Sequence, residues 1–273
     1  MVVQHNMQAA NASRVLNITA SQQTKSTEKL SSGYRINRAA DDAAGLSISE
    51  KMRKQIRGLD RASTNAQDGV SAVQTAEGAL GEVHSMLQRM NELAVQAANG
   101  TNSSKDVKSI SDEVKQLKTE IIRIASTTDF NGKKMLAGTA AANGTNIFVG
   151  YKNEGPVEIT ISGKDLKAVA NTLTSDFDTQ TGAKQLLGEV AAAIEDVSTM
   201  RSDFGAIQNR LEHTIDNLDN VVENVTAAES RIRDTDMADE MVKYSKNNIL
   251  TQAGQSMLAQ ANQSTQGILS LLQ

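Results

Sequence analysis

Hydrophobic residues recur every three or four positions along most of the sequence, and this spacing constrains the fold more than any other feature. A seven-residue repeat beginning at Leu59 places an apolar or small residue at twelve successive positions, the last being Ala97. A second repeat at strict sevens runs from Val190 to Ile232, with companion positions that end at Thr235. Such repeats line one side of an α-helix, which buries that side against other helices. The sequence therefore predicts two long helices packed as in a coiled coil.

The first long helix is expected to begin at Ser47 and to continue to about Ala98. It contains four glycines, each of which weakens a helix by about 1 kcal/mol relative to alanine. We interpret them as sites where small side chains allow another helix to approach closely. The glycines are Gly58, Gly69, Gly78 and Gly81.

A shorter helix follows the turn at residues 99–102. Ser103 and Asp106 have the spacing of a capping pair, and apolar residues continue at heptad spacing from Val107 to Ile124. Because the turn is short, this helix is expected to run antiparallel to the first.

Only residues 146–151 and 157–161 are rich in branched and aromatic residues, and they predict a β-hairpin. Two strands alone are marginally stable, so this hairpin must pack against the helices. Residues 166–173 are compatible with a short helix or a loop. The predicted fold class is therefore mainly α, a long coiled-coil-like helical rod with a small β-hairpin region.

Both ends of the chain are almost free of charge. Residues 1–24 hold one charged side chain, Arg14, and residues 247–273 hold none, although charged types make up 22% of the sequence. Apolar residues at helical spacing occur in both segments. We predict that the ends become helical only when many copies of the chain pack together. The alternative is an ordinary C-terminal helix docked on its own domain. The self-assembly candidates in these segments are Val3, Met7, Leu250, Met257, Ala261, Ile268 and Leu271.

Two arginines and two aspartates crowd the segment that follows the first helical stretch: Arg35, Arg38, Asp41 and Asp42. We consider two interpretations, a solvated linker and a set of ion pairs. The pairs would form within the segment or with a neighbouring copy, and would fix the angle between segments. We include these four residues among the self-assembly candidates.

Composition excludes several classes of protein. The net charge of −4 and the scattered basic residues argue against a nucleic-acid partner. No apolar run is long enough to span a membrane. The N-terminus lacks the features of a cleaved secretory signal, so we expect that an exported chain would use a route that does not read one.

No arrangement of residues argues for catalysis, a cofactor or a metal site. His5, His84 and His213 are far apart and lie in no zinc-binding pattern, and no phosphate-binding glycine loop occurs. We therefore predict that the protein is not an enzyme.

Four stretches of the sequence closely resemble bacterial flagellin. They are residues 29–46, residues 87–101, Asp129-Phe130-Asn131-Gly132 and residues 252–272. Because they lie at both ends and in the middle, the resemblance covers most of the chain. The hairpin region is short and resembles a flagellin with no variable outer domain.

The resemblance implies a structural subunit that polymerises into the extracellular flagellar filament used for motility. It implies that residues 1–42 and 236–273 form an inner tube of paired terminal helices. Residues 43–235, with the hairpin near 146–161, would form an outer helical rod. The implied partners are other copies of the chain, the type III export apparatus, a secretion chaperone that holds the C-terminal segment, and a filament cap.

The resemblance also implies recognition by the host's Toll-like receptor 5. The matching positions are Gln88, Arg89, Glu92, Leu93 and Glu113. Asn91 departs from the basic residue that many activating members carry. Arg89 and Glu92 are equally compatible with contacts between subunits.

Two other functions remain compatible with the sequence. One is a hook–filament junction protein of the same fold, which other proteins would cap. The other is a secreted adhesin or signalling ligand, against which the short hairpin region argues.

Overall fold

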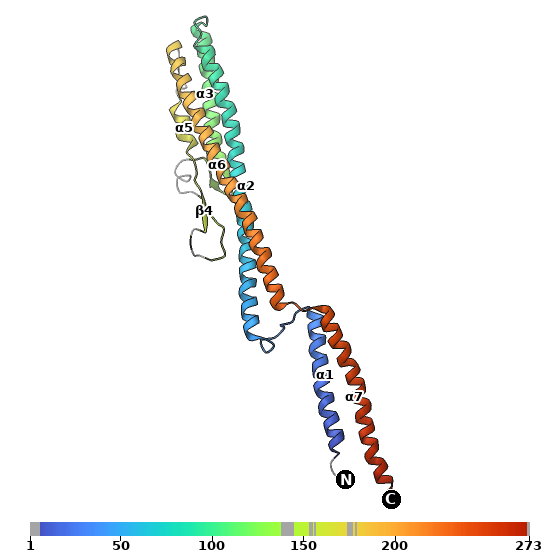
Figure 1. Cartoon of the computed structure of the whole chain (residues 1–273). Coiled ribbons are helices and arrows are strands. Elements are labelled where there is room, and N and C mark those ends of the chain that lie inside the picture. Colours follow the sequence, from blue (N-terminus) through green and yellow to red (C-terminus); the bar gives the residue numbers. More distant parts are fainter. Residues whose placement is uncertain are drawn as a thin grey trace. The chain divides into compact units, whose positions relative to one another are not determined.

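The chain is mainly helical in a computed structural model, which describes residues 6–137, 145–152, 155, 157–173, 177 and 179–271, with the side chains of 265–271 left out. Figure 1 shows the elements. The helices are α1 (Met7–Ser32), α2 (Ala43–Ala97), α3 (Ser104–Thr127), α5 (Leu166–Thr172), α6 (Gln180–Arg233) and α7 (Met237–Leu271). The strands are β1 (Asp129–Phe130), β2 (Lys133–Lys134), β3 (Thr145–Phe148) and β4 (Glu158–Ile161). The predicted fold class is confirmed.

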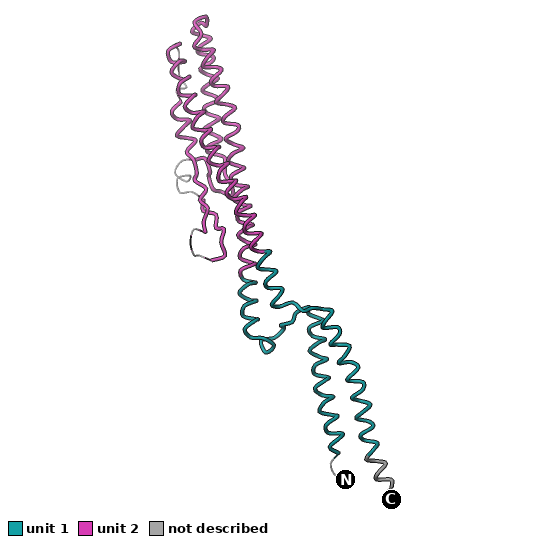
Figure 2. Tube along the Cα trace, in the orientation of Figure 1, with its two compact units in different colours: residues 1–54, 223–273 teal, residues 55–222 magenta. Residues whose placement is uncertain are grey.

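The chain divides into two compact units, coloured separately in Figure 2. Unit 1 comprises Met1–Lys54 and Glu223–Gln273, and unit 2 comprises Gln55–Val222. Each unit therefore combines segments that are far apart in the sequence, and each is described separately below.

Unit 2 contains the large hydrophobic core. All twelve positions of the heptad repeat from Leu59 to Ala97 are buried, as the spacing predicts. From α3, Val107, Val114 and Ile121 join the same core. Figure 1 shows α2, α3 and α6 side by side in this unit. Apolar stripes on three helices thus exclude water from one shared seam.

Helix α6 differs from its predicted limits at both ends. It begins at Gln180, ten residues before Val190, and it ends at Arg233. Thr235 therefore lies beyond the helix, and its backbone N–H donates to the carbonyl oxygen of Gly33 at 3.0 Å. Likewise α2 begins at Ala43 rather than at Ser47.

The predicted hairpin is present as β3 and β4, which pair antiparallel with Ile147 opposite Ile159. Ile159 and Ile161 are buried in the core of unit 2. The side-chain amide of Asn65 on α2 donates to the carbonyl oxygen of Phe148 at 3.0 Å. These contacts confirm that the two strands pack against the helices.

A second, very short hairpin was not predicted. β1 and β2 pair around Asn131 and Gly132, whose φ angles are +50° and +77°. Positive φ at both central residues is the conformation for which Asn-Gly is preferred in two-residue hairpin loops.

The glycines of α2 confirm the predicted close approach of another helix at one of the four positions. A Cβ at Gly58 would lie 2.7 Å from the Cβ of Tyr151, and one at Gly69 would lie 3.2 Å from a side-chain carbon of Ile147. Nothing lies within 4 Å of a Cβ placed at Gly78 or Gly81. At Gly69 a side-chain carbon of Leu211 on α6 also lies 3.3 Å from that position, so another helix does approach there, whereas at Gly58 the neighbouring atoms all belong to Tyr151.

Unit 1 is built on the pairing of α1 with α7, which lie side by side in Figure 1. Both ends are thus helical in the single chain, so the prediction that they become helical only when many copies pack together is wrong. Asn6 caps α1 by accepting from the N–H of Ala9, and its amide donates to the carbonyl oxygen of Ala261 on α7 at 3.0 Å. Gly33, with φ +76°, ends α1 in the left-handed conformation common at helix C-termini. Asp236 caps α7 by accepting from the N–H groups of Ala238 and Asp239.

Candidate self-assembly and receptor-binding surfaces

The terminal helices carry many large apolar side chains but bury almost none of them. Among described side chains of residues 6–54 and 223–264, Ile36 is the one buried large hydrophobic residue. The other buried residues of unit 1 are polar or small, Ser26 and Glu240 among them. The exposed large hydrophobic residues of the two helices are Met7, Val15, Ile18, Met237, Met241, Val242, Ile249, Leu250 and Met257.

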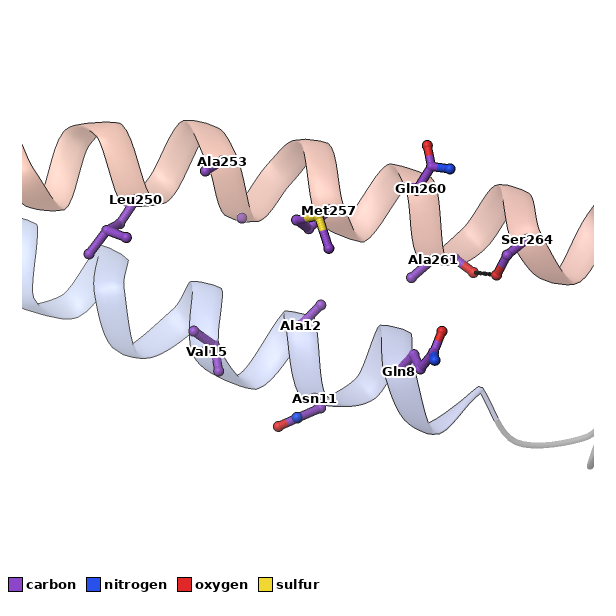
Figure 3. A pocket seen from close by; sticks show the side chains of 11 residues that line it. Gln8, Asn11, Ala12, Val15, Leu250, Ala253, Met257, Gln260, Ala261 and Ser264 are labelled. Carbon is purple, nitrogen blue, oxygen red and sulfur yellow. Dashed lines mark hydrogen bonds between the residues drawn. The ribbon is translucent and has the colours of Figure 1, made fainter.

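A groove of about 520 Å³ lies between α1 and α7 and collects several of the predicted self-assembly residues. Leu250, Met257 and Ala261 line it from α7, opposite Ala12 and Val15 on α1. Figure 3 shows Leu250 and Met257 pointing from α7 towards α1. We call this feature the apolar groove. Its lining holds no charged residue, so covering it with another surface would leave no ion buried without a partner.

The contacts that join α1 to α7 are small or polar. The hydroxyl of Thr251 donates to the side-chain oxygen of Gln23 at 3.2 Å. A Cβ at Gly254 would lie 3.2 Å from a methyl carbon of Leu16, so the absence of a side chain permits the close approach. When a hydrogen bond within the protein replaces a hydrogen bond to water, the net gain is only about 1 kcal/mol. Such contacts therefore hold the two helices together weakly.

The remaining predicted residues of the inner layer are only partly described. Met7, the first residue of α1, is exposed. Val3 lies outside the described residues, as do the side chains of Ile268 and Leu271.

The Arg–Asp segment is ordered by contacts that differ from the predicted pairs within it. Arg35 donates to the backbone carbonyl of Ile232 from its guanidinium, and Arg38 forms an ion pair with Glu28 at 2.9 Å. Asp41 accepts from the backbone N–H groups of Asn37 and Arg38. The prediction of Arg–Asp side-chain pairs within the segment is therefore wrong. Carboxylates so close to backbone donors satisfy those donors before any distant arginine.

Hydrogen bonds also change the acidity of an aspartate in this segment. The pKa of Asp41 lies below its ordinary value, chiefly because the backbone N–H groups of Arg38 and Asn37 donate to its carboxylate. Asp42 accepts from the N–H of Gly45 at 2.8 Å, near the start of α2. Both aspartates therefore stabilise the turn between α1 and α2.

Four of the five predicted receptor-binding residues lie exposed on unit 2. Arg89 donates to Glu113 on α3 at 3.0 Å and to Glu92 on α2 at 3.2 Å. Gln88 is exposed one residue earlier. The pKa of Arg89 is raised above its ordinary value, first by its hydrogen bond to Glu113 and second by its hydrogen bond to Glu92. These four residues, Gln88, Arg89, Glu92 and Glu113, form what we call the Arg89 surface.

Leu93 does not belong to that surface, because its side chain is 1% exposed and lies in the core of unit 2. A buried side chain cannot contact a receptor directly, so Leu93 is removed from the predicted set of receptor-binding residues. Sequence reasoning also missed Val95, which is 56% exposed. Val95 lies seven residues after Gln88, so heptad spacing alone places both on one side of α2.

No described helix has an apolar stretch that could cross a membrane. Nor do the described residues contain a cluster of three side chains suited to holding a metal ion.

Comparison with known proteins identifies two matching regions. Residues 3–141 match the bacterial flagellin N-terminal helical region, and residues 187–272 match the bacterial flagellin C-terminal helical region. Over the full length of both chains, the sequence is 53% identical to flagellin of Halalkalibacterium halodurans and 48% identical to flagellin of Bacillus subtilis. The crystal structure of Bacillus cereus flagellin superposes with a TM-score of 0.51 at 35% identity. It covers 57% of this chain and 88% of that one.

Proposed function

Since the chain belongs to the bacterial flagellin family, we propose that its paired terminal helices form the inner layer of the filament wall. Flagellins are structural subunits, not enzymes, that polymerise into the extracellular flagellar filament for motility, and this chain is accordingly such a subunit. The proposed inner layer comprises residues 1–42 and 236–273. Residues 43–235 would then form the outer rod.

One observation carries the proposal: unit 1 leaves its large hydrophobic residues exposed and therefore has almost no apolar core of its own. Burial of a large apolar side chain stabilises by about 1.5–3 kcal/mol, so the exposed residues gain only when another surface covers them. A homopolymer supplies that surface at every subunit. Its open-ended growth requires that two different faces of each subunit meet.

We expect the double substitution Leu250→Asp with Ile268→Asp to abolish polymerisation while unit 2 remains folded. An aspartate at position 250 would place a carboxylate without a partner in the apolar groove, and an unpaired buried charge costs several kcal/mol. Seeded growth followed by electron microscopy measures polymerisation, and near-ultraviolet circular dichroism monitors the fold.

The matched control is Leu250→Met with Ile268→Val, which keeps both positions apolar and should still form filaments. Filaments of normal length from the aspartate variant would refute the assignment of these two residues to the inner layer.

We propose the Arg89 surface, with Val95 beside it, as the part of the chain that Toll-like receptor 5 recognises. The surface offers a charged cluster next to an exposed apolar side chain, a combination frequent in protein interfaces. Asn91 is the position that departs from the pattern of many activating flagellins.

Arg89→Ala should reduce the response of receptor-expressing reporter cells to the monomer by tenfold or more, since arginines at the centre of an interface often contribute about 2 kcal/mol. Arg123→Ala is a matched control, because Arg123 is also exposed and pairs with a nearby glutamate, Glu120. An unchanged response to Arg89→Ala would remove that residue from the receptor site and leave contact between subunits as its role.

The family membership also supports three further partners: the type III export apparatus, a secretion chaperone bound to the C-terminal segment, and the filament cap. The part of α7 that follows Lys246 carries no charged residue and several exposed apolar ones, so it is suited to a chaperone that covers it before assembly. Copurification of such a chaperone with the full chain, and its loss from a chain ending at Lys246, is the expected result.

A further inference from the structure

Unit 1 has a second hollow, of about 300 Å³, that differs from the apolar groove in its charge. Two helices contribute its lysines, Lys25 and Lys29 from α1 and Lys243 and Lys246 from α7. Glu240 is the one acidic residue of the lining, so the lining carries a net charge of +3. We call this feature the lysine hollow. It lies beside terminal segments that are otherwise almost without charge.

Most of this positive charge is not neutralised within the described part of the chain. Lys243 pairs with Glu240 at 3.1 Å, whereas Lys25, Lys29 and Lys246 form no ion pair with a described residue. Glu240 is buried and also hydrogen-bonded by the hydroxyl of Ser26.

An amide side chain also lines the same hollow. Asn247 is 8% exposed, and its side-chain amide bonds to no described residue. Carboxylate oxygens accept hydrogen bonds from both amides and ammonium groups. The lining is therefore suited to several carboxylates at once.

Unit 2 carries a complementary set of charges on α6. Glu212, Asp216 and Asp219 follow one another at spacings of four and three residues, so they lie on one side of the helix, and all three are exposed. We call them the acidic stripe. No lysine or arginine occurs from residue 211 to residue 230, and none of the three forms an ion pair with a described residue. Their net charge is −3.

We propose that the lysine hollow of one copy binds the acidic stripe of a second copy in the filament. Charge complementarity carries the inference: a +3 hollow that also offers an amide donor meets a −3 helix face of the same polymer. The stripe is about 10 Å long at 1.5 Å per residue, which spans the turns of α1 and α7 that bear the lysines. The proposal rests on the inner-layer assignment above, because the hollow is part of the same unit.

Such a contact would determine how neighbouring copies align with each other more than how tightly they bind. Exposed ion pairs contribute little individually, yet complementary charges steer association and disfavour wrong alignments. Because the hollow and the stripe are different surfaces, the contact can repeat from one copy to the next, as the growth of a filament requires.

The test uses two full-length variants of opposite design. One carries Lys25→Glu, Lys29→Glu and Lys246→Glu, and the other carries Glu212→Lys, Asp216→Lys and Asp219→Lys. At low ionic strength each variant alone should polymerise from seeds at least tenfold more slowly than the unaltered chain. An equimolar mixture should recover the rate, because hollow and stripe then attract each other in mixed contacts.

A set of lysines outside the hollow provides the matched control. Lys105→Glu, Lys108→Glu and Lys133→Glu make the same charge change on exposed residues of unit 2 and should leave the seeded rate within about twofold. A further variant with glutamine at the three lysines of the hollow should slow growth less than glutamate does. It guards against misfolding caused by charge reversal.

Three outcomes would overturn the proposal. Unaltered growth of both charge-reversed variants would do so, as would a mixture that grows no faster than its components. Saturable binding of inorganic phosphate to the unaltered monomer, without rescue in the mixture, would assign the hollow to a free anion. Failure of the inner-layer assignment is distinguishable, because Leu250→Asp with Ile268→Asp should not be rescued by mixing with either charge variant.

Discussion

Arg233 shows how single residues organise the junction of unit 1. Its guanidinium lies 4.8 Å from the centre of the Tyr34 ring and pairs with Glu50 at 3.0 Å. Beside it, the N–H of Arg35 donates to the carbonyl oxygen of Arg233. A planar guanidinium combines stacking with ion pairing, which an ammonium group cannot reproduce. Arg233 thus joins three segments that are distant in sequence.

The contrast between glycines of α2 predicts opposite effects of the same substitution. Gly78→Ala should stabilise unit 2 by about 1 kcal/mol, because the added methyl group meets nothing and alanine favours the helix. Gly58→Ala should destabilise it, since the methyl group would overlap the Cβ of Tyr151. Denaturation by urea, followed by circular dichroism, measures both changes.

The two glycine variants serve as controls for each other, because both lie inside the same helix. Equal stabilisation by both would mean that Tyr151 moves away without cost, and would contradict the close packing of the hairpin region on α2.

The exposure of individual side chains was harder to infer from the sequence than the presence of the helix that carries them. The heptad count from Leu59 assigned twelve buried positions correctly, yet Leu93 is also buried and lies outside that count. It is one position before Ala94, where α3 also packs on α2. A second packing partner widens the buried side of a helix beyond two positions per heptad.

At the level of elements, the start of α3 offers a local test of stability. Ser103 and Asp106 form a complete capping box, as their spacing predicted. Ser103→Ala should destabilise unit 2 by about 1 kcal/mol, the usual effect of losing an N-cap. Ser109→Ala, on the same helix, is the control. Its hydroxyl bonds only to the carbonyl of Lys105, so its loss should be nearly neutral.

The same cap predicts a dependence on pH. The pKa of Asp106 lies below its ordinary value of 3.8, first because of the hydrogen bond from the Ser103 hydroxyl and second because of the Ser103 N–H. A depressed pKa adds stability above pH 4, which is lost as the pH falls through the folded-state pKa. The difference in melting temperature between the unaltered chain and Ser103→Ala should therefore shrink between pH 5 and pH 2.5. A difference that stays constant would contradict the role of the Asp106 carboxylate.

Long helices were predictable because their apolar spacing persists over many turns, whereas short strands leave little periodicity. The β1–β2 hairpin was missed for that reason, although Asn131-Gly132 is a strong two-residue turn signal. The contacts of the Arg–Asp segment depend on the end of α6, almost 200 residues away, which a local pattern does not contain. Val95 was within reach, by extending the spacing from Gln88.

At the scale of the whole molecule, the two units differ in how they are stabilised. Unit 2 has a continuous apolar core, whereas unit 1 depends on polar contacts between α1 and α7. The charge-free ends indicated from the sequence that the terminal segments gain little from folding alone, but the pairing of α1 with α7 within one chain was not predicted.

We expect amide hydrogen exchange on the monomer in dilute solution to be fast in α1 and α7 and slow in α2, α3 and α6. Local openings require little free energy where few apolar side chains are buried. In filaments the terminal helices should become protected by several orders of magnitude. Strong protection of both terminal helices in the monomer would contradict folding coupled to assembly.

The pairing of α1 with α7 also determines when unit 1 can form. The bond from Asn6 to Ala261 joins residues 255 positions apart, and α1 has its partner only once both extremities of the chain are free to meet. Unit 2 begins and ends inside that span, so its core can form first. A chain that emerges gradually from a narrow channel would therefore form the contacts between its two terminal helices last. Truncated chains that lack either terminus would contain a folded unit 2 but no paired terminal helices. We expect that the growing polymer would not incorporate them.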